Sequence, residues 1–361
     1  MTRNRRIYLL SPKDLSPETI AVTFAKTSRS PKPFDEIASE LTEDRSAQFH
    51  EKWVVGYGHA SVAEHAVLHL ALENVSRLAI ETIEGNRLAS YTEKSSRYQQ
   101  WDRDAFYIPE ELRDNRLKEV FIDTCNHLFR TYHETIPVVE SWLKHVRPQK
   151  EKESENAYQR GIRGEAIDNC RFLLPAASLA NVGVTINARA LEYAICKMLS
   201  SPLKEVQDIG KKLREVGQKE APTLVKYSAC NQYLVDSRKK MSAYAQGLSA
   251  RPLGGGMQLI DWDRNGEQKV LAAMLYRFGG EHDFKTYFEY IQSLSQDHLK
   301  NLASDGMSGR GKFDQPLREF EYAQMTFDLV MDQGAYFEFK RHRMMTQTTQ
   351  PLSPMLGFAV P

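Results

Sequence analysis

Apolar residues recur at helical spacing in several parts of the first half of the chain. Residues 17–27 predict a short helix and residues 114–146 a long one. Ser201 followed by Pro202 is typical of a helix cap and first turn, so we expect a further helix from there. The apolar positions of the two later helices should lie in the core: Leu117, Val120, Phe121, Leu128, Phe129, Tyr132, Leu203, Val206, Leu213 and Val216.

A strand that runs directly into a helix is predicted next to the first of several polar motifs. Residues 66–73 read AVLHLALE, which indicates a buried strand, and the following VSRLAIETI indicates a helix. By contrast, residues 147–164 are rich in Lys, Glu and Gln, and we interpret them as a solvated helix end or loop. A strand that continues directly into a helix should hold the loop after that helix in a fixed position.

The clearest break in the pattern is the segment QGLSARPLGGG, residues 246–256. Beyond it, an apolar helix (270–278) precedes the segment EYAQMTFDLVM (321–331) and a helix ending in basic residues. Four residues of that segment match positions around the first strand: Glu321, Ala323, Thr326 and Phe327 match Glu64, Ala66, His69 and Leu70. This indicates an internal repeat. We predict a module at 1–245, a linker at 246–256 and a partial second module at 257–361.

Charge and composition exclude some classes of function. Lys and Arg number 48 against 47 Asp and Glu, so the net charge of +1 does not predict binding to nucleic acid or to a membrane. The four cysteines are scattered, which favours a reducing cytoplasm, and they are expected to be small core residues. The apolar run at residues 7–10 is too short for a signal peptide or a transmembrane span.

Several polar motifs occur in a fixed order along the first module. Residues 87–98 read RLASYTEKSSRY, in which Arg87, Ser90, Glu93, Ser95 and Arg97 precede Tyr98. Upstream lie His59, Ser61, Glu64 and His65, and downstream lie RFLLP (171–175) and TINAR (185–189). This order resembles that of the flavin-dependent thymidylate synthases, whose signature is Arg-His-Arg-x-x-Ser followed by a polar loop ending in Ser-x-Arg-Tyr. The resemblance covers residues 1–245.

The resemblance implies a fold and a reaction. The fold would be α+β, with helices packed on a largely antiparallel sheet, here duplicated. The reaction would be methylation of dUMP to dTMP, in which methylenetetrahydrofolate supplies the carbon, bound FAD relays hydride and NADPH reduces the flavin. The protein would be a homo-oligomer with sites at the interfaces between modules.

Both copies of the signature are damaged, in complementary ways. In the first copy Gly85 and Asn86 replace Arg-His, whereas the second keeps Arg341, His342 and Arg343 but loses the polar loop. We therefore expect the two halves to complete one another across a module interface. An arginine that the family directs at the uracil ring falls at Met198, which weakens the expectation of activity.

Candidate site residues follow from these matches. Arg and Ser donors suit phosphate oxygens. The resemblance assigns cofactor binding to Ser61, Glu64, Arg87, Asn187, Arg189, Arg341, His342 and Arg343, and substrate binding to Glu93, Ser95, Ser96, Arg97 and Arg171. No catalytic residue is assigned, and no metal is expected, because His59 and His65 have no third ligand at a suitable spacing.

Alternatives remain for individual residues and for the whole chain. Arg171 in an apolar context needs an anionic partner, which could be a substrate or an acidic side chain. Asn187 could serve only to cap its helix. The rival function is that of a degenerate homologue that binds a flavin or nucleotide, or takes part in assembly, without turnover.

Overall fold

The computed structural model describes residues 5–52, 60–246, 256–353 and 357. It divides into two compact units, Met1–Ser249 together with Gln333–Pro361, and Ala250–Asp332. The predicted linker lies largely outside the described residues. The division differs from the predicted modules in one respect, because Gln333–Pro361 belongs to the first unit instead of the second.

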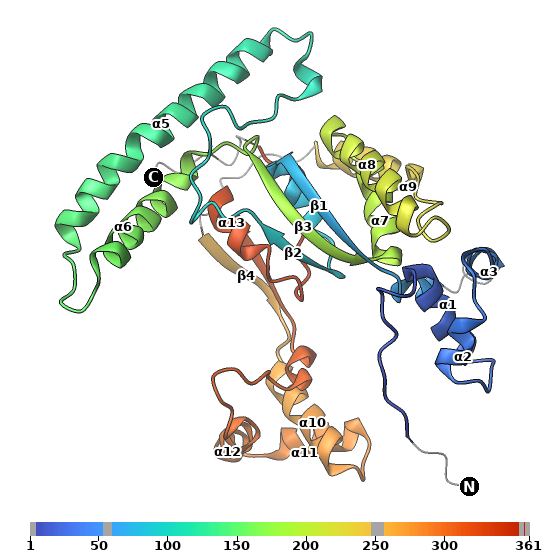
Figure 1. Ribbon diagram of the computed structural model, residues 1–361. Coiled ribbons are helices and arrows are strands. Elements are labelled where there is room, and N and C mark those ends of the chain that lie inside the picture. Colours follow the sequence, from blue (N-terminus) through green and yellow to red (C-terminus); the bar gives the residue numbers. More distant parts are fainter. Residues whose placement is uncertain (1–4, 53–59, 247–255, 354–356, 358–361) are drawn as a thin grey trace. The chain divides into compact units, whose positions relative to one another are not determined.

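The first unit is built on a three-stranded antiparallel sheet in the order β1-β3-β2 (Figure 1). Its strands are β1 (Val67–Ser76), β2 (Ala89–Glu93) and β3 (Leu179–Asn187). In the register, Leu68 pairs with Ile186, which in turn pairs with Ala89. Residues far apart in the sequence therefore meet at each end of the sheet.

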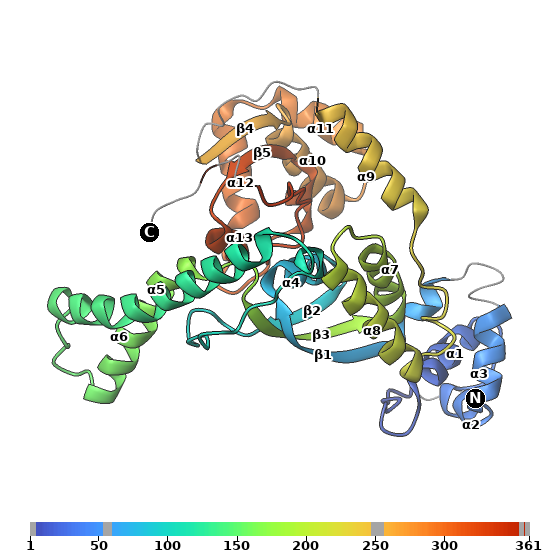
Figure 2. The ribbon, with the colours of Figure 1, turned by 90° about the horizontal axis from the view of Figure 1, so that it is seen from above.

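The rest of the described first unit is mainly helical. Its helices are α1 (Pro17–Thr27), α2 (Phe34–Ser39), α3 (Glu43–Phe49), α4 (Arg77–Glu84), α5 (Leu117–Val146), α6 (Glu155–Cys170), α7 (Ala188–Leu199), α8 (Lys204–Glu220), α9 (Gln232–Ala245) and α13 (Gln333–Phe339). Short 3-10 turns include η2 (Ala60–Glu64) and η4 (Arg171–Leu173). Helices α5 and α6 lie side by side as a long pair that projects from the sheet (Figures 1 and 2).

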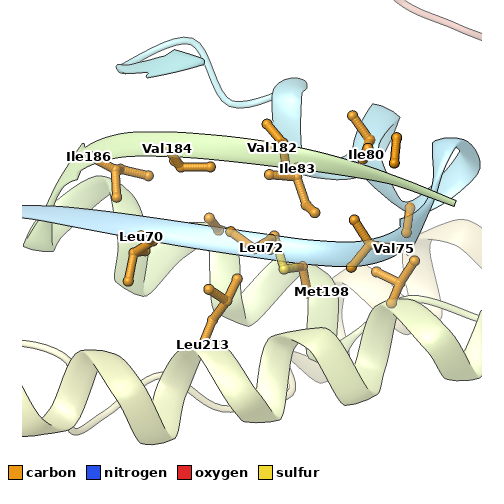
Figure 3. Close-up of a cluster of buried hydrophobic side chains, with 14 of the residues drawn as sticks. Leu70, Leu72, Val75, Ile80, Ile83, Val182, Val184, Ile186, Met198 and Leu213 are labelled. Atoms are coloured by element: carbon orange, nitrogen blue, oxygen red, sulfur yellow. The ribbon is translucent and has the colours of Figure 1, made fainter. Parts of the chain in front are cut away.

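One face of the sheet carries the core. Buried and exposed positions alternate along β1 and β3, as expected for a sheet covered on one side. Figure 3 shows Leu70 and Leu72 of β1 against Met198 of α7 and Leu213 of α8. The tight approach of α7 and α8 depends on Gly210, where an added Cβ would lie 2.8 Å from the Met198 Cβ.

Side-chain caps determine where the helices that leave the sheet begin. Ser76, the last residue of β1, accepts a hydrogen bond from the Ala79 N–H and starts α4. Asn187, the last residue of β3, does the same with the Ala190 N–H and starts α7. The capping role proposed for Asn187 is thereby confirmed. Each strand leads into its helix without a loop, which gives the site a rigid base.

The edge strand β2 is covered by the C-terminal segment 333–347. Arg343 donates hydrogen bonds to the carbonyl oxygens of Arg87, at 2.9 Å, and of Ala89. Arg87 in turn donates to the Met345 carbonyl and the Thr346 hydroxyl, at 3.2 and 2.9 Å. Such contacts satisfy polar groups that an edge strand would otherwise expose.

The second unit is smaller. It contains the two-stranded antiparallel pair β4 (Gly256–Trp262) and β5 (Met325–Val330), and helices α10 (Gly266–Gly279), α11 (Phe284–Ser293) and α12 (Gln296–Met307). Its own apolar cluster comprises Val270, Leu271, Ala272, Met274, Ile291 and Leu299. Along the chain, η5 (Arg318–Tyr322), β5 and α13 follow the same order as η2, β1 and α4. Duplication remains a prediction.

The structure confirms the α+β class and the predicted order of elements, with several corrections. A helix end or loop was expected at 147–164, but residues 155–164 belong to the regular helix α6. The helix after Ser201 begins at Lys204, with Leu203 instead of Ser201 at the N-cap position and without a side-chain cap. Four expected core residues are exposed instead, two in the first turns of α5, one just before α8 and one within α8: Leu117, Val120, Leu203 and Val216.

Two further expectations concerned the burial of the cysteines and the absence of a transmembrane span. All four cysteines lie in the described residues and carry free thiols, and Cys230 is exposed instead of in the core. None of the helices that the structure describes has the length and apolar character required to cross a membrane.

Two glycine substitutions test the packing of α7 on α8. Gly210→Ala should destabilise the protein by about 1–3 kcal/mol, because its methyl group would overlap the Met198 side chain. Gly164→Ala in α6 has no neighbour within 4 Å and should stabilise by about 0.5–1 kcal/mol through helix propensity alone. Urea unfolding of both variants measures the difference, and equal effects would contradict the proposed close approach.

Candidate functional site

The candidate site lies where the end of β2, the start of η4 and the end of α13 meet. Ten residues line it: Arg77, Glu93, Lys94, Ser95, Ser96, Arg97, Arg171, Phe337, Glu338 and Arg341. All five residues predicted to bind the substrate are among them. Between the lining side chains there is about 10 Å³ of space, enough for one water molecule.

The lining is strongly cationic. Five of its side chains carry positive charge and two carry negative charge: Arg77, Lys94, Arg97, Arg171 and Arg341 against Glu93 and Glu338. The whole chain has a net charge of only +1, so this excess is local. A small cavity with such lining favours an anion.

Of the two arginines predicted to bind the substrate, Arg171 is more deeply buried than Arg97. Its side chain is 10% exposed, and its Nε lies 2.9 Å from Asp168 Oδ1. Its Nη1 lies 3.4 Å from Glu338 Oε1 and donates to Ser96 Oγ at 3.5 Å. The acidic partner expected for a buried arginine is therefore present within the protein.

The loop after β2 holds its two basic residues in different ways. Arg97 Nε donates to Asp168 Oδ2 at 3.3 Å, so one carboxylate joins Arg97 and Arg171. The Lys94 ammonium instead lies over the Trp101 ring, 4.6 Å from its centre. Cation–π contact draws Lys94 toward the buried indole.

A buried ionic cluster underlies the site. Lys340 Nζ lies 2.7 Å from Glu84 Oε2 and 3.7 Å from Glu93 Oε2. Arg77 Nε lies 3.6 Å from Glu93 Oε1, and its guanidinium stacks 3.5 Å from the centre of the Phe337 ring. Burial lowers the pKa of Arg77 to about 10 and raises the pKa of Glu93.

Glu81 is the acidic group of this cluster most affected by burial. Desolvation raises the pKa of its carboxyl to about 7, against the opposing effects of Lys340 and Arg77. Its Oε1 is buried without a hydrogen-bond partner. An unpaired buried carboxylate is costly, so the neutral form of Glu81 is favoured below about pH 7.

The residues predicted to bind the cofactor divide into three groups. Arg343 donates to the Arg87 and Ala89 carbonyls beside β2, and Arg87 donates to the Met345 carbonyl and the Thr346 hydroxyl. Ser61, Glu64, Asn187 and Arg189 gather where β1 begins and β3 ends, and there Arg189 pairs with Glu64. Arg341 lines the cationic site, and His342 is exposed next to it in the chain.

Some sequence-based expectations concern residues elsewhere. His59 lies outside the described residues. Met198 is 1% exposed and belongs to the core between the sheet and α8. Asn86 is buried, and its side chain donates to the Ile83 carbonyl at 2.8 Å as a C-terminal helix contact.

Four important residues were missed by sequence reasoning: Asp168, Phe337, Glu338 and Lys340. Phe337, Glu338 and Lys340 immediately precede the Arg-His-Arg triplet, and this proximity was the available signal. Asp168 stands three residues before Arg171, the spacing of neighbours on a helix.

Comparison with known proteins identifies the family. The family model described as "Thymidylate synthase complementing protein" matches residues 10–223. The chain therefore belongs to this family, and its resemblance to flavin-dependent thymidylate synthases is confirmed. A flavin-dependent thymidylate synthase of Clostridium tetani is 29% identical over 215 residues, which are 59% of this chain and 82% of that protein.

A second relative matches over more of the chain. A UPF0159 protein of Chlamydia muridarum is 31% identical over 340 residues, which are 89% of this chain and 64% of that protein. The chain thus spans less than two thirds of the length of this relative. Among solved structures, flavin-dependent thymidylate synthase ThyX from Helicobacter pylori, complexed with FAD and dUMP, matches with a TM-score of 0.39 and 19% identity, over 60% of this chain and 96% of that one.

The raised pKa of Glu81 predicts a pH-dependent stability. In the unfolded chain the glutamate carboxyl has a pKa of about 4.3. Between that pH and about 7, the unfolded state releases a proton that the folded state keeps, so stability falls as the pH rises. Glu81→Gln should remove this loss, making the variant more stable than the wild type by roughly 2–3 kcal/mol at pH 8 but nearly equal at pH 4.

Urea unfolding of Glu81→Gln at both pH values measures this effect. Glu134→Gln, at an exposed position of α5, is the matched control and should change little at either pH. A variant that is no more stable than the wild type at pH 8 would refute the assigned state of Glu81.

Proposed function

We propose that the chain is a flavin-dependent thymidylate synthase module that methylates dUMP to dTMP. Methylenetetrahydrofolate and NADPH would be its co-substrates and FAD its cofactor. The observation that carries this proposal is that Arg341, from the intact triplet, lines the same cavity as Ser95, Ser96 and Arg97, from the intact polar loop. The two damaged signatures thereby supply one set of side chains, as expected if they complement each other.

The chemistry of the lining suits a nucleotide phosphate. Arg171 and Arg97 present guanidinium groups to the cavity, and the Ser96 hydroxyl is buried beside Arg171. Guanidinium forks and hydroxyls are the donors that phosphate oxygens prefer. In the bound state these residues would hold the phosphate and orient the nucleotide. The free space of about 10 Å³ requires that lining side chains move when it binds.

The residues present fit FAD in part. Asn187, Arg87 and Arg343 make hydrogen bonds within the protein, and their role is to shape the site. Ser61, Glu64, Arg189 and His342 are exposed or half-buried and would contact the cofactor. FAD, when bound, supplies the hydride relay of the reaction. A flavin titration is expected to give one FAD per chain or fewer.

A second candidate function is supported by two observations. The position that the family gives to a uracil-directed arginine is the core residue Met198, and Asn86 is a buried helix contact. These replacements favour a homologue that binds a nucleotide or flavin without turnover. Lys197 does not compensate simply by being adjacent, because one step along a helix rotates the side chain by about 100°.

Release of tritium from labelled dUMP distinguishes the two functions. The purified protein, given FAD, methylenetetrahydrofolate and NADPH, should release tritium as dTMP forms. Omission of the folate gives the background. Binding of dUMP without release above that background would reject the synthase and support the binding protein.

The two basic residues of the loop should differ in their contribution to dUMP binding. Arg97→Ala should weaken binding by about tenfold or more, since a guanidinium–phosphate pair can contribute a few kcal/mol. Lys94→Ala should weaken it by less than about threefold, because the half-buried ammonium is engaged by the Trp101 ring. Calorimetry on both variants measures the losses, and equal losses would indicate that the loop acts only as diffuse positive charge.

A further inference from the structure

Glu338 occupies the position in the cationic site that is best placed for an anionic ligand. Its Oε2 lies 2.9 Å from Arg341 Nη1, and its Oε1 lies 3.4 Å from Arg171 Nη1. The two arginines come from segments about 170 positions apart in the chain, and this single carboxylate joins them. Arg171 has an additional carboxylate partner in Asp168, so it is not left unpaired without Glu338.

The site has too little room for this carboxylate and a phosphate group together. The lining leaves about 10 Å³, whereas a phosphate needs several times the volume of a water molecule. A phosphate dianion beside an ionised carboxylate would also be repelled by it. Either the ligand binds elsewhere or Glu338 leaves its place.

Glu338 is well placed to leave. Its side chain is 37% exposed, and it stands in the last turn of α13, where rotation about its side-chain bonds leads to solvent. Lys340 and Phe337, its neighbours in the chain, are buried against Glu84 and Arg77. The segment therefore stays anchored while the Glu338 side chain rotates.

We propose that Glu338 is an internal substitute for the ligand's phosphate group, which must displace it from Arg171 and Arg341 in order to bind. This inference rests on the proposed anion site and adds to it a competing group within the chain. The carboxylate keeps the two arginines paired and the site closed when no ligand is present. It lowers the affinity for phosphate monoesters and selects against anions too weak to displace it.

Two substitutions of Glu338 and one control substitution on α8 test the proposal with the full chain. Glu338→Gln keeps the shape but removes the charge, and it should bind both dUMP and inorganic phosphate about fivefold to tenfold more tightly than the wild type. Glu338→Asp keeps the charge on a side chain too short to reach both arginines, and it should bind with intermediate affinity. Glu215→Gln, an exposed residue of α8 whose partner is Lys212, is the control and should match the wild type.

Calorimetry with each probe separates the outcomes. If Glu338→Gln binds with the same or lower affinity, Glu338 holds the arginines for the ligand and the proposal is wrong. If Glu338→Asp matches the wild type while Glu338→Gln binds more tightly, only long-range charge is involved and displacement is again rejected.

The proposed function can fail separately. If no form binds dUMP, but phosphate follows the expected order of affinity, the site takes an anion other than dUMP and the role of Glu338 stands. If neither probe binds to any form, both proposals fail. Thermal unfolding of each variant without ligand establishes that the variants are folded.

Discussion

The buried ammonium of Lys340 is the interaction on which the candidate site depends. It lies 6% exposed between Glu84, at the end of α4, and Glu93, at the end of β2. A lone buried charge costs several kcal/mol, so these carboxylates and the lysine require one another. Because Lys340 precedes Arg341 directly, the same contact fixes the backbone that carries the Arg-His-Arg triplet. The open edge of β2 and the cationic site are both completed by one short segment.

Much of the fold followed from the sequence because its signals are local. The bounds of α1 agree with the predicted 17–27, and the strand running directly into a helix was predicted from the change of hydrophobic period, although the strand continues to Ser76 and not only to residue 73. Burial was harder to predict where tertiary packing decides it. Leu117 and Val120 continue the apolar stripe of α5, yet they are exposed in its first turns.

The site was predictable only where motifs carry it. The loop at 95–97 and Arg171 were found from their order along the chain, and the structure brings them together with Arg341. Asp168, Glu338 and Lys340 were missed because their role comes from tertiary pairing, which has no fixed spacing in the sequence. The predicted second module placed 333–361 apart from the first, although the ionic contacts of Lys340 attach this segment to it. The similar order of elements in the two parts of the chain does not indicate against which unit residues 333–361 pack.

The central claim is that a residue far along the chain completes the anion site of the first unit. The most direct measurement is the affinity for dUMP of Arg341→Ala in the full chain, determined by calorimetry. Arg113→Ala is the control, because Arg113 is 70% exposed and pairs with Glu110 beside it. The account predicts that Arg341→Ala weakens binding by about tenfold or more while Arg113→Ala binds like the wild type. Wild-type affinity in Arg341→Ala would contradict it.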